Sequence, residues 1–419
     1  MTPDKIKKLL IVFVPLAVVV LVAGIFLFNR HNEEIMGGPA GEIAPGEVVS
    51  ANWAPFYPVH WDSYQTNLEN DAKPSHFEGR EYLRTIYAGF GFAAEYNEPR
   101  GHLYTIEDVI AIDPARKKAG ASCITCKSTQ VPELMEKYGA DYFLMSFDEI
   151  IDEVTEPIGC LDCHDPATAK LRLSRPALIN ALERQGRDID KIPTQEMRTL
   201  VCAQCHVTYY FQPPGKEVFF PWDKGTTAGD ILAFYDEAGF SEWTHPDAGT
   251  GLVKPRHAEY ETFLGSTHQT AGLSCADCHM PYTKIGNKKI SSHKWQSPLN
   301  NIEESCTNCH RNGTEWLQDR VKTIQTQVKE TQDTAGWAVV GAINELKASR
   351  EAGVDDARLQ EAMELHRQAQ WYLDYVAVTN GLGFHNPTET LSNLATAIDS
   401  AHKSMESSRE ARLAVGEQI

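Results

Sequence analysis

Ten cysteines in this 419-residue chain form five Cys-x-x-Cys pairs, with none left over. Four pairs are followed directly by histidine, in the segments CLDCH (160–164), CAQCH (202–206), CADCH (275–279) and CTNCH (306–310). The first pair, Cys123 and Cys126, is followed by Lys127 instead. Five copies of one short motif indicate one kind of chemistry repeated along the chain.

Three kinds of chemistry use such pairs. Disulfides across so short a loop suit redox enzymes, but five in one chain would be unusual. Zinc sites combine Cys-x-x-Cys units two at a time and would leave one unit without a partner. Covalent c-type haem needs both sulfurs and an adjacent histidine, which four motifs supply in register. The sequence therefore predicts covalent haem c on Cys123, Cys126, Cys160, Cys163, Cys202, Cys205, Cys275, Cys278, Cys306 and Cys309.

The residue after each pair is expected to ligate the haem iron from one face. These proximal ligands are His164, His206, His279 and His310, with Lys127 at the first motif. The second axial position decides the role, because a second histidine leaves an electron carrier and an open face admits a substrate. Of the 15 histidines, 11 remain as possible second ligands: His31, His60, His76, His102, His245, His257, His268, His293, His366, His385 and His402.

Lys127 sets the first motif apart from the other four. An amine ligates iron only when it is neutral, so the metal has to suppress its protonation. A haem with a different proximal ligand is the natural candidate for the reactive one. The alternative is that this pair carries no haem and that Lys127 is a surface residue.

Further segments surround the motifs: YNEPRGHLY (96–104), CAQCHVTYYF (202–211), KPRHAEYE (254–261), SSHKWQSPL (291–299) and GFHNPTE (383–389). With one CxxCK and four CxxCH in this order, they resemble the pentahaem cytochrome c nitrite reductases, the ammonia-forming enzymes. The resemblance covers about residues 52–408. It implies five covalently bound haems c and six-electron reduction of nitrite at the Lys127 haem, fed by four bis-histidine haems.

The resemblance also assigns residues to roles. It places Tyr209, three residues after CAQCH, and His257, in KPRH, above the open face of the reactive haem. An arginine completes this set, with Arg116 in the loop before CITCK expected and Arg100 in EPRGH as the alternative. For the other haems it pairs His293 with His164, His102 with His206, His385 with His279, and His268 with His310.

One departure concerns calcium. Many members of the resembled family bind calcium beside the active site through a glutamate after CxxCHV and a glutamine in K-x-Q-H. Here these positions hold Thr208 and Arg256. A carboxylate is lost and a fixed cation is gained, which would repel calcium. We therefore expect calcium to be absent and Arg256 to replace it in holding Tyr209 and His257.

The N-terminus indicates export. Three lysines precede residues 9–28, which carry no charge and as a helix would span roughly 30 Å. The positive-inside rule predicts a cytoplasmic N-terminus at residues 1–8, a transmembrane signal-anchor at 9–28 and a periplasmic body held at the inner membrane. A signal peptide that is cleaved after export is the alternative, although residues 26–30 are a poor cleavage context.

Three further regions follow: a linker at 29–52, a pentahaem catalytic region at 53–312 and a helical region at 313–419. The expected fold class is mainly α, a multihaem cytochrome c with a haem-packed core and long C-terminal helices. The resemblance implies that these helices form a homodimer contact.

Helical spacing supports the C-terminal assignment. Leu317, Val321, Ile324 and Val328 recur at intervals of four, three and four. Gly353 is expected to stop this helix, and the next is expected to end near residues 380–381. Asp355 or Asp356 is expected to cap that second helix, and Asn386, Pro387 and Glu389 open a third in capping-box fashion.

The net charge of −18 argues against nucleic acid as a partner, because phosphate contacts need a basic surface. Three other functions compete: an electron conduit with all irons saturated, an enzyme acting mainly on hydroxylamine or sulfite, and a membrane-tethered structural protein. The paired cysteines argue against the last. The resemblance implies a membrane-bound quinol-oxidising multihaem cytochrome as electron donor.

Overall fold

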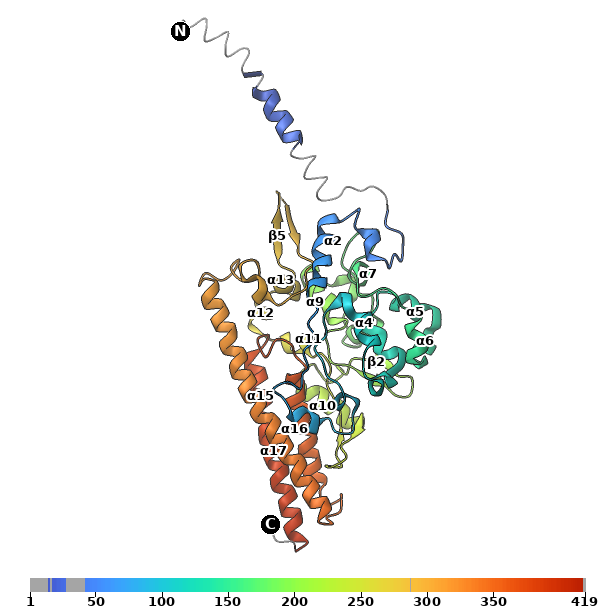
Figure 1. The fold of residues 1–419 in the computed structure, drawn as a ribbon, viewed down its shortest axis with the longest axis vertical. Helices are drawn as coiled ribbons and strands as arrows, with labels where there is room; N and C mark the ends of the chain where they lie inside the picture. The colour runs from blue at the N-terminus through green and yellow to red at the C-terminus, as the bar shows by residue number, and fades with distance from the viewer. Residues whose placement is uncertain (1–13, 16, 28–41, 287, 417–419) are drawn as a thin grey trace, which may run out of the picture.

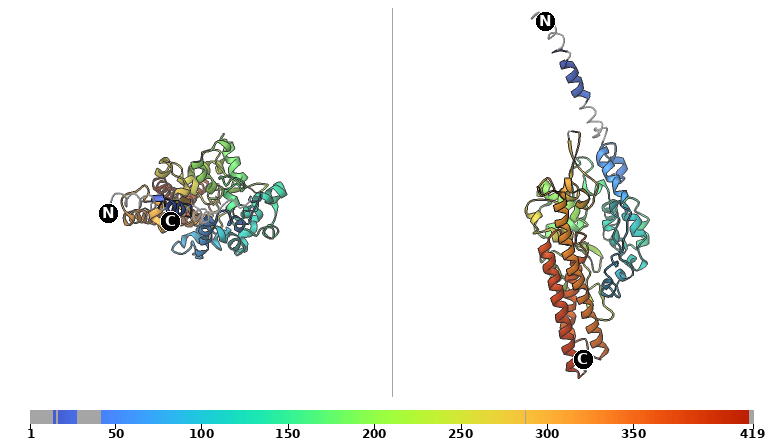
Figure 2. Two further views of the ribbon diagram at one scale, coloured as in Figure 1. Left: turned by 90° about the horizontal axis from the view of Figure 1, so that it is seen from above. Right: turned by 60° about the vertical axis from the view of Figure 1, so that its left-hand side comes forward.

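A computed structural model describes residues 14–15, 17–27, 42–286 and 288–416. The chain is mainly helical, and three long helices run along the length of the molecule (Figure 1). They are α15 (Thr314–Glu351), α16 (Gln360–Ala377) and α17 (Pro387–Ala414). They lie side by side with the cysteine-rich region packed against them (Figure 2). The predicted fold class is confirmed.

Apolar faces hold the three long helices together. One buried cluster joins Val339 and Leu346 of α15, Leu373 of α16 and Leu394 of α17, with alanines between them. Alanine combines high helix propensity with a small side chain, which allows the helix axes to approach closely. The long helices are therefore set by their own sequence pattern.

Of the four expected helix boundaries, the stop of α15 and the start of α17 are confirmed, and α16 ends at Ala377, close to the expected 380–381. Gly353 follows α15 with φ +85°, and the side chain of Asn386 accepts a hydrogen bond from the Glu389 backbone N–H at 3.4 Å to cap α17. The expected cap of α16 by Asp355 or Asp356 is wrong. This helix begins only at Gln360, because Asp355 instead accepts the backbone N–H of Arg358 in the preceding turn, at 3.1 Å.

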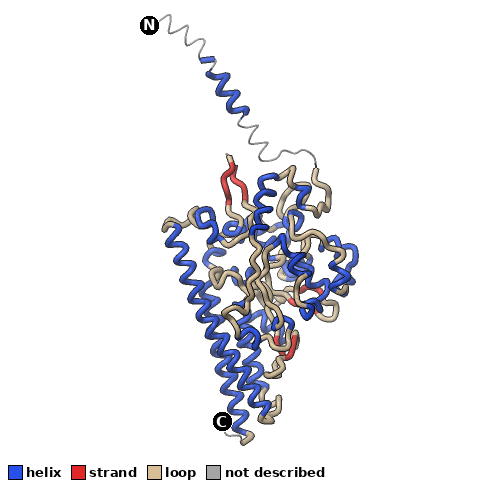
Figure 3. The backbone as a smooth tube through the Cα atoms, in the orientation of Figure 1, coloured by secondary structure: helices blue, strands red, loops and turns tan. Residues whose placement is uncertain are grey.

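The cysteine-rich region consists of short helices joined by long loops (Figure 3). Its α-helices are α2 (Pro58–Gln65), α3 (Tyr82–Ile86), α4 (Thr105–Ile110), α5 (Val131–Tyr138), α6 (Phe147–Ile151), α7 (Cys160–Cys163), α8 (Pro176–Arg184), α9 (Thr194–Ala203), α10 (Ala228–Glu237), α11 (Glu259–Phe263), α12 (Thr267–Thr270), α13 (Cys275–His279) and α14 (Ile302–Ser305). Its 3-10 helices are η1 (Ser50–Trp53), η2 (Thr66–Glu69), η3 (Gly91–Ala93), η4 (His102–Tyr104), η5 (Pro114–Cys126), η6 (Gly139–Leu144), η7 (Ile189–Lys191) and η8 (Pro298–Asn301).

Strands are short and antiparallel. In the described residues they pair as β1 (Tyr210–Gln212) with β2 (Glu217–Phe219), β3 (Trp243–Thr244) with β4 (Gly251–Leu252), and β5 (Tyr282–Ile285) with β6 (Lys288–Ser291). Buried side chains of this region fall into separate clusters rather than one core. A cavity lies beside two of these clusters and is lined by residues such as Trp53 and Tyr260.

Within the described residues, no helix combines the length and the apolar character needed to cross a membrane. The signal-anchor expected at 9–28 lies partly outside those residues, as do the expected cytoplasmic N-terminus and most of the expected linker. Where the linker is described, Ile43 packs with Trp53 and Leu161.

Candidate active site

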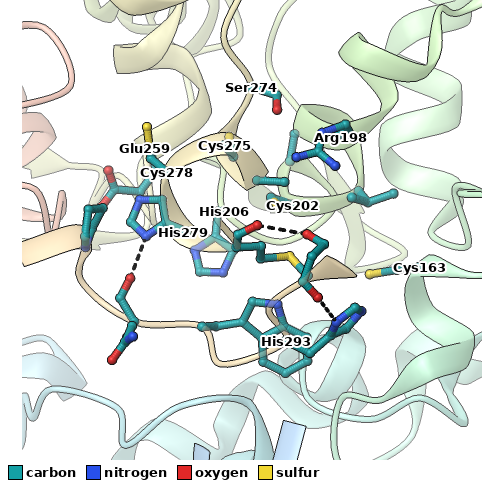
Figure 4. Close-up of a pocket in the computed structure, with 18 of the residues that line it drawn as sticks. Cys163, Arg198, Cys202, His206, Glu259, Ser274, Cys275, Cys278, His279 and His293 are labelled. Atoms are coloured by element: carbon teal, nitrogen blue, oxygen red, sulfur yellow. Dashed lines mark hydrogen bonds between the residues drawn. The ribbon is translucent and has the colours of Figure 1, made fainter. Parts of the chain in front are cut away.

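A cavity of about 2550 Å³ runs through the cysteine-rich region. Small-molecule sites usually occupy roughly 300–1,000 Å³, so this one has room for several large cofactors. Its walls carry nine of the ten cysteines and all nine residues expected as axial ligands, and all ten cysteines are free thiols. Several of these side chains surround the same space in Figure 4. Apolar residues of α15, including Leu317, Val321 and Ile324, close one side.

The structure brings together each of the four expected histidine pairs. An imidazole nitrogen binds a metal ion at about 2 Å, so the ring centres of two imidazoles on one ion lie about 6 Å apart. The ring centres are 5.9 Å apart in His102–His206, 6.1 Å in His164–His293, 6.1 Å in His279–His385 and 6.2 Å in His268–His310. The donor set and its spacing therefore fit four haem irons with two histidines each.

Hydrogen bonds at Nδ1 orient several of these imidazoles. Nδ1 of His164 donates to the carbonyl of Ala169 at 2.8 Å, that of His293 to Ser291 at 2.9 Å and that of His279 to Gln296 at 3.0 Å. Nδ1 of His385 donates to the carboxylate of Glu259 at 2.8 Å. A partner on Nδ1 fixes the tautomer and leaves Nε2 as the ligating nitrogen.

The motifs themselves form a row. Cys126 of the first motif hydrogen-bonds Cys205 of the third, which lowers the pKa of Cys126 to about 7. Cys202 of the third motif hydrogen-bonds Cys275 of the fourth. The hydroxyl of Ser305, beside the fifth motif, donates to the carbonyl of Cys278 at 3.0 Å. First, third, fourth and fifth motifs are thus neighbours in that order.

A buried arginine connects three motifs, and no sequence pattern pointed to it. Arg175 is 1% exposed. Its guanidinium donates to the carbonyl of Thr125 in CITCK at 2.9 Å and to the carboxylate of Asp162 in CLDCH at 2.5 Å. Its backbone N–H donates to Gln204 in CAQCH at 2.9 Å. Because an unpaired buried charge is costly, this set fixes the motifs relative to one another.

Lys127, Tyr209 and His257 gather at the first motif, and all three line the cavity. Burial, together with the nearby Lys127 and His206, lowers the pKa of His257 to about 3. Burial raises the pKa of Tyr209, as does the neighbouring Cys126. Both side chains are therefore neutral near pH 7, so His257 acts as a hydrogen-bonding group rather than as a fixed cation.

The two candidate arginines differ in their surroundings. Arg100 lines the cavity, but its guanidinium pairs with Glu107 at 2.7 Å and Asp108 at 2.8 Å. Arg116 instead stacks on the ring of Phe92 at 4.2 Å. Burial lowers the pKa of Arg116, and Cys123 of the first motif is close enough to raise it. Arg116 is not among the residues that line the cavity.

Arg256 lies behind Tyr209 and His257. Its guanidinium pairs with Glu242 at 2.5 Å and donates to the carbonyl of Lys254, and its backbone N–H donates to the hydroxyl of Thr208 at 3.0 Å. Burial alone would lower the pKa of Arg256, but Glu242 raises it above its usual value. Arg256 and Thr208, expected together from the sequence, are in direct contact.

Sequence reasoning missed four charged side chains beside this site, of which Lys254 and Asp374 are fully buried and Glu242 and Glu259 mostly buried. Glu242 accepts Arg256, and Glu259 accepts His385. Lys254 is buried with its Nζ 3.2 Å from Asp374, and burial lowers its pKa to about 8. Lys254 and Glu259 lie within KPRHAEYE, so their closeness to His257 in the sequence could have identified them as candidate site residues. No such pattern pointed to Glu242 and Asp374.

Comparison with known proteins decides the family. Residues 50–418 match the sequence profile of the family Cytochrome c552. The chain belongs to that family. Cytochromes of this family carry covalent haem c, and the free thiols and paired histidines of the cavity fit that group.

Several relatives support the assignment. The chain is 40% identical over 405 residues to a "Cytochrome c-552" of Bacteroides thetaiotaomicron, covering 94% of this chain and 80% of that one. It is 35% identical over 420 residues to the "Cytochrome c nitrite reductase subunit NrfA" of Nitratidesulfovibrio vulgaris, covering 88% and 80%. The solved cytochrome c nitrite reductase of Desulfovibrio desulfuricans matches with a TM-score of 0.84 and 32% identity over 90% of each chain, and is described with two calcium sites.

Proposed function

We propose that this oxidoreductase reduces nitrite to ammonium at the first motif, with Lys127 as the proximal ligand of its haem. The observation that best supports this proposal is the arrangement of the candidate haem ligands around the cavity. Eight histidines form four pairs at the spacing of two ligands on one iron. The first motif is left with Lys127, which is close enough to His257 to lower its pKa, and Tyr209 lies near Cys126 of the same motif. The named nitrite reductases among its relatives support the same substrate.

The reaction consumes six electrons and eight protons per nitrite and releases ammonium and two waters. A haem held by Cys123, Cys126 and Lys127 would supply the iron that binds nitrogen and passes electrons. Arg116 provides positive charge that attracts the anion and favours charge developing on oxygen. Neutral His257 donates a hydrogen bond from its ring N–H, and the Tyr209 hydroxyl donates another. Both side chains also lie where protons must arrive.

Arg116 is the better candidate for the substrate arginine. Arg100 already satisfies two carboxylates, and moving it toward an anion would break both pairs. The guanidinium of Arg116 lies 4.2 Å from the centre of the Phe92 ring, and the guanidinium of Arg256 lies 5.5 Å from the same ring centre. The shared contact with Phe92 supports a role for Arg116 near Arg256 and the adjacent Tyr209 segment.

The calcium replacement is also part of the proposal. The guanidinium of Arg256 donates a hydrogen bond to the carbonyl of Lys254, and Glu242 neutralises the positive charge of that guanidinium. A divalent cation at this point would face that guanidinium at close range. Arg256 thus connects Thr208, beside Tyr209, to the segment that carries His257.

The other four haems would form the electron path. The row of first, third, fourth and fifth motifs gives an unbroken series of neighbours that ends at Lys127. The second motif joins beside the first through Arg175. We further propose export to the periplasm, homodimerisation through the long helices and a membrane-bound quinol-oxidising cytochrome as electron donor.

The first test is turnover by the matured, haem-loaded protein. With a reduced viologen dye and nitrite, we expect ammonium at six electrons per nitrite. Tyr209→Phe is expected to lower kcat by about tenfold or more, because it removes a donor at the reacting atoms. Tyr210→Phe is the matched control, since Tyr210 is buried away from the cavity. Haems that are reduced by the dye but not reoxidised by nitrite would favour an electron conduit.

A further inference from the structure

Glu259 lies between the active-site segment and the C-terminal helices. It is the first residue of α11 and follows His257 by two positions. One carboxylate oxygen accepts from Nδ1 of His385 at 2.8 Å, and the other accepts the backbone N–H of Asn380. Its side chain is 14% exposed. Figure 4 shows Glu259 on the cavity wall near His279 and Cys278.

The partner of His385 differs in charge from those of the other oriented imidazoles. His164, His279 and His293 all donate their Nδ1–H to backbone carbonyls, which are neutral. His385 alone among these four donates to a carboxylate. An imidazole that donates to a carboxylate becomes a more basic ligand, because negative charge is shared across the hydrogen bond.

We propose that Glu259 is a positioning residue that gives the haem on Cys275 and Cys278 the lowest reduction potential of the four bis-histidine haems. This rests on the proposed function, since it needs His279 and His385 as the two ligands of that haem. An oxidised haem carries one more positive charge than the reduced form. A more basic axial ligand and a buried anion beside it both stabilise that charge, so both effects lower the potential.

The position of this haem in the row of motifs indicates how a low reduction potential would affect electron transfer. Its motif lies between the third and fifth motifs in the row that ends at Lys127. A low-potential centre there delays the uptake of one electron until the donor is strongly reducing. An electron that does reach it then has a downhill path toward the third motif and the reactive centre.

The test is a potentiometric titration of the fully haem-loaded protein, followed by absorbance and by electron paramagnetic resonance of the low-spin ferric signals. In Glu259→Gln we expect one haem to become easier to reduce, with its reduction equilibrium constant raised tenfold or more, which is 59 mV for one electron. Glu261→Gln controls for the exchange of a carboxyl for an amide in the same helix, because Glu261 is a buried glutamate whose bonds go to Thr208 and Trp222 and to none of the proposed ligands. It is expected to shift no haem.

Glu259→Asp separates charge from volume. It keeps the carboxylate and is expected to retain most of the low potential. The inference would be overturned if Glu259→Asp shifted the reduction potential as much as Glu259→Gln does. It would also be overturned if Glu259→Gln shifted the potential of no haem.

Two outcomes in other samples keep the inference testable if Glu259→Gln does not mature. His385→Ala is expected to convert one low-spin haem to high spin. If all low-spin signals remain in this variant, the proposed ligation itself is wrong. In the unmodified protein, the signal that His385→Ala removes should be the last of the four to disappear on reduction. If another signal disappears last, the ligation stands and the role of Glu259 is wrong.

Discussion

At the scale of single residues, the chemistry of the site depends on charges that are buried and paired. The Arg256 guanidinium hydrogen-bonds to Glu242 and to the carbonyl of Lys254, and the Arg256 backbone N–H donates to the hydroxyl of Thr208. Removing one member of such a set leaves the others without partners in a medium of low dielectric constant. The predictions at this scale concern the protonation and ion dependence of individual side chains.

Replacing Arg256 should create a requirement for calcium. Arg256→Gln alone is expected to lower nitrite turnover, because the Lys254 carbonyl and Glu242 lose their cation. The double variant Thr208→Glu with Arg256→Gln restores the residues of the calcium-binding pattern, so added calcium should recover activity and a chelator should abolish it. Turnover of the unmodified protein should not change with either reagent. A chelator-sensitive unmodified protein would contradict the replacement.

Glu261 should make stability depend on pH. Burial raises the pKa of its carboxyl to about 8, and among the described residues its second oxygen has no hydrogen-bond partner. Between the unfolded value of 4.5 and about 8 the folded state therefore holds a proton that the unfolded state has lost. The free energy of unfolding should fall as pH rises through this window, by at most about 1.4 kcal/mol per pH unit.

The measurement is denaturant unfolding of the haem-loaded protein at several pH values from 5 to 8, ~one unit apart. Glu261→Gln cannot titrate and mimics the protonated side chain. Its stability relative to the unmodified protein should therefore increase with pH. Parallel pH profiles for the two proteins would show that Glu261 is ionised in the folded state.

At the scale of elements, close approaches between helices decide which positions tolerate change. Gly336 lies in the middle of α15, and an added Cβ would come within 2.5 Å of the ring of Tyr82 on α3. Tyr82 is 2% exposed and bonds to Asp333, so its ring has little freedom to move. Replacing glycine in a helix normally stabilises by about 1 kcal/mol, but the contact reverses that gain here.

We expect Gly336→Ala to destabilise the protein by about 1–3 kcal/mol through overpacking. Gly341→Ala is the matched control on the same helix. Its Cβ would meet the flexible end of Met405 at 2.9 Å, so the net change should be small. Thermal unfolding of both haem-loaded variants checks this. Equal melting temperatures would mean that Tyr82 can move aside.

The same scale shows what sequence reasoning can reach. The long helices were predictable because their apolar residues repeat at helical spacing and Gly353 and Asn386 mark boundaries. The start of α16 was not, because several acidic residues could cap it and only the folded turn selects one. Motif residues could be placed by pattern, and the structure brings the expected pairs together. The sequence pattern could not place Arg175, Glu242 and Asp374, because their partners come close only in the folded structure.

At the scale of the whole molecule, the exposed apolar residues of the long helices support the proposed homodimer. Trp337 is 57% exposed on α15. We expect Trp337→Lys to shift the protein from dimer to monomer in sedimentation experiments, because a charge would be buried at the contact. Leu144→Lys is the control, an equally exposed apolar residue on η6 outside the long helices. A monomeric unmodified protein would contradict the dimer.

The large cavity has a consequence for how the protein is made. The fifth motif ends at residue 310, and α15 begins at Thr314 and places Leu317, Val321 and Ile324 against the cavity. We expect the cofactors to complete the packing of these side chains, since all three line the cavity. A chain missing a cofactor would therefore keep the start of this helix undocked and open to proteases. We therefore expect the C-terminal helices to close over the cavity only in copies whose cofactor loading is complete.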